Sequence, residues 1–224
     1  MSAAAEHGHD EHHPPYLAHH FFNMSQQADS VKMGMWLFLV QEILFFAGLF
    51  MAYIVMRYIY PDTWLAAAEE LDKVMGATNT VVLLTSSLTM ALGVRAAQMG
   101  KNKAVAAWCA ATLLGAYGFM IIKFIEYSHK LHVGLLPGKF FSFEGLEQSA
   151  TEAPQIFFSV YFMMTGVHGL HVVIGIGVIA WIMLKAMGNS FNPENYAAVE
   201  NVGLYWHLVD LIWIFLFPLL YLVR

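Results

Sequence analysis

Long apolar blocks alternate with shorter polar segments along the chain, and five of these blocks could cross a membrane. A hydrocarbon layer about 30 Å thick takes about 20 helical residues. The blocks run over residues 31–58, 76–98, 104–127, 155–186 and 198–223. Because a segment in lipid must satisfy its backbone hydrogen bonds internally, each block is expected to be a helix. The sequence therefore predicts an all-α integral membrane bundle of five transmembrane helices.

The remaining segments are polar. Residues 1–30 contain six of the 11 histidines, and we interpret them as a mobile, His-rich N-terminal tail, although such a tract can also bind metal. No apolar stretch precedes the first span, so no cleavable signal peptide is expected. The connections 60–75 and 131–154 carry acidic residues and are expected to lie in water. Without an internal repeat, residues 31–224 are predicted to form one transmembrane domain.

Composition agrees with this pattern and adds an orientation. The chain is 58% hydrophobic and only 12% charged, against about 25% charged residues in soluble domains. Its net charge of −5 and scattered basic residues exclude a nucleic-acid-binding surface. Arg95, Lys101 and Lys103 share one short connection, and the positive-inside rule favours the cytoplasm for it. The N-terminus is then cytoplasmic and the C-terminus outside.

Five ionisable residues lie well inside the predicted spans, where a charge at the bilayer centre costs at least about 2.5–3.5 kcal/mol. Glu42 is close to mid-depth in the first span, among leucine, isoleucine and phenylalanine. The fourth span carries His168 and His171, and the fifth carries His207 and Asp210, each pair at i, i+3. Side chains so placed need partners, so we expect these five to form a polar seam between helices.

Three interpretations of this seam remain open: interhelical hydrogen bonds that hold the bundle together, a proton or lipid-headgroup site, and, least favoured, a metal site. Gly166 and Gly169 flank His168, and we expect them to admit a neighbouring helix closely. Lys123 and Glu126 are predicted to form a local ion pair near the end of the third span. No catalytic nucleophile with a base and no phosphate-binding loop is recognisable.

Several motifs resemble those of subunit III of the haem–copper terminal oxidases, in its five-helix form. The strongest are Thr165–Val172, which reads TGVHGLHV, and Tyr205–Trp213, which reads YWHLVDLIW. The segment Met33–Phe46 around Glu42 and the segment Asn79–Leu84 add to the likeness. A weaker match is Phe124–Tyr127. The similarity extends over nearly the whole chain from about residue 31.

This resemblance implies a noncatalytic subunit without haem or copper of its own, which packs against catalytic subunit I, next to subunit II, and supports proton uptake and sustained turnover. Haem and copper are expected in those partner subunits, and membrane lipids as further partners. Glu42 matches the family's buried glutamate, Glu126 matches less securely, and Lys185 corresponds to a basic residue that contacts lipid phosphate in larger members. The implied location is the bacterial inner membrane.

Two other functions stay open at this point. An accessory subunit of a nitric-oxide reductase would share the fold, and a small proton-coupled transporter could also use buried Glu, His and Asp residues. The electron donor, cytochrome c or quinol, does not follow from the sequence.

Overall fold

The computed structural model describes residues 21–136, 154–193 and 195–223, with the side chains of Met24 and Pro154 excepted. The described residues form α-helices and no β-strand. Five of the helices are long and apolar enough to cross a membrane, as the sequence predicted. The helices are α1 (Met24–Ile59), α2 (Pro61–Glu69), α3 (Lys73–Gln98), α4 (Asn102–Val133), α5 (Pro154–Met187) and α6 (Ala197–Tyr221).

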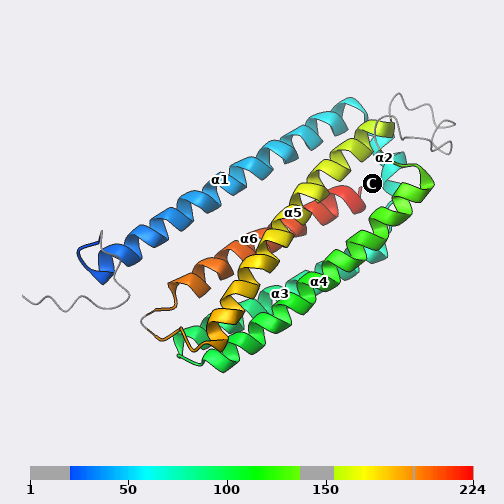
Figure 1. Cartoon of the computed structure of the whole chain (residues 1–224). Helices are drawn as coiled ribbons and strands as arrows, with labels where there is room; N and C mark the ends of the chain where they lie inside the picture. Colours follow the sequence, from blue (N-terminus) through cyan, green and yellow to red (C-terminus); the bar gives the residue numbers. More distant parts are fainter. Residues whose placement is uncertain (1–20, 137–153, 194, 224) are drawn as a thin grey trace, which may run out of the picture.

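Helix α6 lies at the centre of the bundle and α1 at its edge. Figure 1 shows α5 and α6 between α1 on one side and the antiparallel pair α3 and α4 on the other. Of the spanning helices α6 is the most buried and α1 the least. Most of the large apolar side chains of α1 are exposed, which in a membrane means contact with lipid or with another protein.

The helix ends extend beyond the apolar blocks. Helix α1 begins at Met24, seven residues before the expected span, because the Asn23 side chain accepts a hydrogen bond from the backbone N–H of Gln26 and caps it. The first turns of α1 therefore belong to the segment that we had interpreted as tail. The histidines at positions 7–20 lie outside the described residues.

One short helix was missed. Helix α2 lies within the connection that we expected to be polar and in water, and its Trp64 ring is fully buried between Tyr53 and Phe157. Pro61 at the first helical turn is the local signal that could have revealed the helix.

Close helix contacts occur at glycines other than those expected. A Cβ atom on Gly175 would lie 2.7 Å from the Trp206 ring, so only glycine lets α5 and α6 approach there. Gly166 and Gly169 have open space instead and line a cavity of about 340 Å³ between α4 and α5. Our expectation that these two glycines admit a neighbouring helix was wrong.

Candidate functional site: buried ionisable groups

Glu42 and His171 meet near the middle of the membrane span and join α1 to α5. Oε2 of Glu42 lies 3.0 Å from Nε2 of His171, and both side chains are largely buried. The rings of Phe45 and Phe46 pack beside the imidazole, and the Tyr205 hydroxyl donates to the backbone carbonyl of His171. The sequence predicted both residues in one seam between helices, without assigning Glu42 a particular partner.

The second nitrogen of His171 determines the chemistry of this pair. Nδ1 lies 2.8 Å from the Val167 carbonyl oxygen, which can only accept, so Nδ1 carries a hydrogen. The contact between Nε2 and Glu42 then requires one further proton, held either by the carboxyl group or by the imidazole. Glu42 and His171 are therefore joined by a hydrogen bond whose proton belongs to one of the two side chains.

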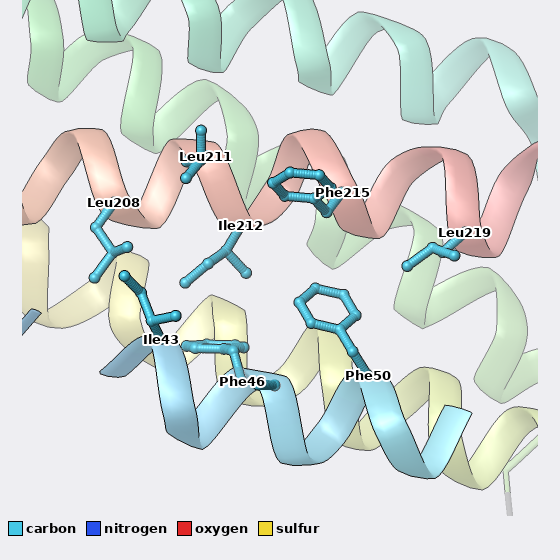
Figure 2. A pocket seen from close by; sticks show the side chains of 9 residues that line it. Ile43, Phe46, Phe50, Leu208, Leu211, Ile212, Phe215 and Leu219 are labelled. Carbon is cyan, nitrogen blue, oxygen red and sulfur yellow. The ribbon is translucent and has the colours of Figure 1, made fainter. Parts of the chain in front are cut away.

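Helix α1 also lies beside α6. An apolar groove of about 250 Å³ separates them, and Figure 2 shows Ile43, Phe46 and Phe50 of α1 facing Ile212 and Phe215 of α6 across it. The side chains that line it are all apolar, and beyond Phe50 the Tyr53 hydroxyl of α1 donates a hydrogen bond to the Leu219 carbonyl of α6. The Glu42–His171 contact to α5 and the Tyr53–Leu219 contact to α6 therefore both attach α1 to the bundle.

His207 and Asp210 face α3 rather than Glu42. Nδ1 of His207 lies 2.6 Å from the hydroxyl oxygen of Ser87. The same hydroxyl lies near the Asp210 carboxyl group, but neither carboxyl oxygen has a hydrogen-bond partner among the described residues. Asp210 is nonetheless buried. A second polar site thus lies between α3 and α6, separate from the Glu42–His171 pair.

His168 joins neither site. It is fully buried between the rings of Phe119 and Trp213, and neither of its nitrogens has a partner among the described residues. Residues at i, i+3 on a helix point about 60° apart, which is enough to direct His168 into the core and His171 toward α1. The expected seam is therefore divided into three places.

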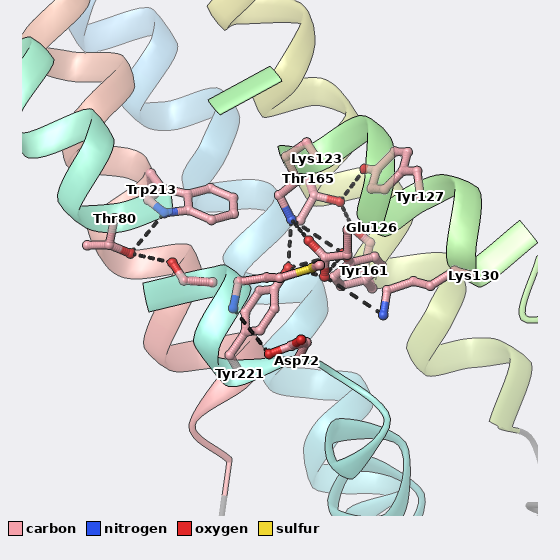
Figure 3. A network of polar contacts seen from close by, with 12 residues as sticks. Asp72, Thr80, Lys123, Glu126, Tyr127, Lys130, Tyr161, Thr165, Trp213 and Tyr221 are labelled. Atoms are coloured by element: carbon pink, nitrogen blue, oxygen red, sulfur yellow. Dashed lines mark hydrogen bonds and ion pairs between the residues drawn. The ribbon is translucent and has the colours of Figure 1, made fainter. Parts of the chain in front are cut away.

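The most extensive polar network surrounds Glu126 of α4 and lies near the C-terminal end of α6 (Figure 3). Lys123 donates to Glu126 Oε2 at 2.9 Å, so the predicted ion pair forms. The hydroxyls of Tyr161 and Tyr221 both donate to Glu126 Oε1, at 2.9 and 2.6 Å. Lys123 also donates to the Tyr221 hydroxyl and lies over the Trp213 ring, and Lys130 lies 3.8 Å from Glu126. Helices α4, α5 and α6 are thereby linked through one carboxylate.

Sequence reasoning missed the tyrosines of this network, because a tyrosine in a span is ordinarily read as packing or as an interfacial anchor. Lys130, at i+4 from Glu126, was a usable signal. Lys185 is exposed near the end of α5, with its ammonium over the Trp181 ring. Within the described ranges, no three His, Cys, Asp or Glu side chains gather closely enough to hold a metal ion.

Comparison with known proteins assigns the family. The family described as cytochrome c oxidase subunit III matches residues 14–223. A probable cytochrome c oxidase subunit 3 of Nocardia farcinica is 34% identical, over 87% of this chain and 88% of its own length. A quinol oxidase subunit 3 of Bacillus subtilis is 31% identical over 85% and 86%. The chain belongs to the cytochrome c oxidase subunit III family, and this membership places it in an oxidase complex.

Proposed function

We propose that this chain is the noncatalytic subunit III of an aerobic haem–copper terminal oxidase, in which it supports proton uptake and sustained turnover. In this proposal it packs on catalytic subunit I, alongside subunit II, and those partners carry the haem and copper. Electrons come from cytochrome c or from a quinol, since the relatives' names include both kinds of oxidase. The product is water, and oxygen reduction is coupled to proton translocation.

The observation that carries the proposal is the Glu42–His171 pair. A proton held between two buried side chains can be taken up or released without a large rearrangement, as a proton-supply site requires. The same contact attaches the weakly packed helix α1, whose exposed apolar face offers a surface to a neighbouring subunit. Glu42 thus combines proton holding with bracing of the bundle.

The proposed oxidase role also implies a location and an orientation. The complex lies in the bacterial inner membrane, with the N-terminus in the cytoplasm and the C-terminus outside. Arg95, Lys101 and Lys103, at the turn between α3 and α4, support this orientation through the positive-inside rule. Lys185 lies at the same end of the bundle, where its ammonium is available to a lipid phosphate.

The test is Glu42→Gln in the assembled complex. The amide keeps the shape but cannot hold that proton as the carboxyl group does, and a hydrogen bond in a membrane bundle contributes only about 0.6 kcal/mol on average. We therefore expect normal assembly and haem content, slower proton uptake and inactivation after fewer turnovers. Stopped-flow pH-indicator measurements and activity over repeated turnover provide the readout.

Gln41→Ala is the matched control, because Gln41 is adjacent on α1 and exposed. Proton-uptake kinetics and working life equal to wild type in the Glu42→Gln complex would reduce Glu42 to a packing role. A purified chain that transported protons in liposomes without haem-bearing partners would contradict the oxidase assignment itself.

A further inference from the structure

A polar pocket of about 400 Å³ lies between α3 and α6, at the end of the bundle that carries the basic turn. Arg95 and Gln98 of α3 and Glu200 of α6 line it together with Gly203, and the ring of His207 also borders it. It is the most polar of the pockets described above, unlike the apolar groove between α1 and α6. Charged side chains along its wall favour water over lipid as its content.

A glycine lets α3 and α6 approach closely beside this pocket. A Cβ atom at Gly203 would lie 2.8 Å from a methyl carbon of Val94, so a larger residue there would collide with α3. The two helices approach closely at that point, and polar side chains border the space beside it. Because α6 begins at Ala197, His207 lies about 15 Å along the helix from its start. The pocket therefore extends from the membrane surface well into the bilayer.

Beyond His207, polar atoms continue toward the centre of the membrane. Nδ1 of His207 is hydrogen-bonded to Ser87, and the Ser87 hydroxyl lies near the carboxyl group of Asp210. Asp210 is 3% exposed and its oxygens are not paired with any described protein group. A buried carboxyl group without a protein partner is costly unless water or a proton satisfies it.

We propose that the α3–α6 pocket is a hydrated proton-access site, through which Asp210 exchanges protons with the aqueous phase by way of His207 and Ser87. A hydronium ion in the pocket gives one proton to the imidazole, and the imidazole passes a proton from its ring nitrogen to Ser87. The serine hydroxyl passes its own proton, by way of a bridging water molecule, to the Asp210 carboxylate, which has no direct hydrogen bond to Ser87. The net change is one carboxylate and one hydronium converted to one carboxyl group and one water, with no redox partner required.

The site deepens the proposed function, since it rests on the role in proton uptake and assigns to it a route separate from Glu42. Neither the hydration of the pocket nor proton exchange at Asp210 depends on that role. A hydrated pocket and an exchangeable buried carboxyl group are properties of the chain that can be measured without any assay of oxidase activity.

Hydration is tested by thiol labelling in the intact complex with a membrane-impermeant, charged methanethiosulfonate reagent, which reacts with a thiolate in contact with water. Ala91→Cys and Leu204→Cys place thiols in the pocket. Leu88→Cys and Leu211→Cys are the controls, because these leucines are 61% and 47% exposed but lie outside it. The native Cys109 is fully buried and contributes no background.

We expect the two pocket cysteines to react at least about tenfold faster than the two controls, a difference of about 1.4 kcal/mol in activation free energy. Pocket cysteines that react no faster than the lipid-facing ones would overturn the proposal, because the pocket would then be dry or covered.

The relay is tested by infrared spectroscopy of the same complex after transfer to deuterated water. The carbonyl band of a protonated Asp210, assigned by its loss in Asp210→Asn, should shift promptly in the wild type. Ser87→Ala should slow this shift at least about tenfold. Thr85→Val is the control, because the Thr85 hydroxyl bonds only to backbone carbonyls of its own helix.

Unchanged exchange in Ser87→Ala, or no Asp210 band that shifts in deuterated water, would overturn the relay. If Asp210→Asn prevents assembly, the comparison of Ser87→Ala with wild type still decides the question. These outcomes are separable from failure of the proposed function, which would appear as altered partners or as normal proton uptake in Glu42→Gln.

Discussion

Two regions along α6 bury ionisable groups in opposite ways. Around Glu126, the carboxylate and Lys123 both have protein partners, supplied by α4, α5 and α6. Around Asp210, a buried carboxyl group has one nearby hydroxyl and no hydrogen-bonded protein partner among the described residues. A fully partnered network holds helices together and needs nothing further, whereas an unpartnered carboxyl group next to a polar pocket is complete only with water.

The largest effect is expected when the network around Glu126 loses its carboxylate. Glu126→Leu leaves the Lys123 ammonium buried without its counter-charge, so the free energy of unfolding should fall by about 3–5 kcal/mol. Unfolding of the purified chain in mixed micelles with increasing sodium dodecyl sulfate measures this quantity.

The matched control for that variant removes both charges. Lys123→Met combined with Glu126→Leu should recover most of the loss, because an apolar pair of similar size is often neutral or stabilising in place of a buried ion pair. A single variant that cost less than about 1 kcal/mol would mean that water already reaches Lys123.

A smaller effect is expected from the tyrosine that links α6 to the network. Tyr221→Phe removes a hydroxyl that donates to Glu126 and accepts from Lys123, each at 2.6 Å. The loss should be about 1–3 kcal/mol in the same unfolding measurement. Tyr117→Phe on the exposed side of α4 should change stability by less than about 0.5 kcal/mol. Equal effects at the two tyrosines would show that the network is not what stabilises this end of the bundle.

The sequence predicted the fold well, because long apolar blocks in lipid admit little besides helix. It predicted the helix ends less well. Capping by Asn23 extends α1 beyond its apolar block, and α2 is stabilised by burial of Trp64, which only the assembled bundle provides. Hydrophobic patterning reports where lipid lies, whereas caps and tertiary contacts decide where a helix stops.

For the buried groups, depth in the membrane identified which residues need partners but not which partners they find. Glu42 and His171 do meet. His168 points into the core, about 60° around α5 from His171, whereas His207 faces α3 together with Asp210. Ser87 and Tyr221 carried no signal of their own, since one hydroxyl in a span becomes meaningful only when another helix places an ionisable group beside it.

The smallest effect is expected in the other region, around Asp210. Asp210→Asn removes no hydrogen bond to a described protein group, so the free energy of unfolding should change by less than about 1 kcal/mol. Glu126→Gln is the matched substitution in the partnered network, where hydrogen bonds to a charged group are weakened, and it should cost about 1.5–3 kcal/mol. Both variants are measured in the same micelles. A cost at Asp210 as large as that at Glu126 would mean that Asp210 has a structural partner, and the contrast between the two regions would be lost.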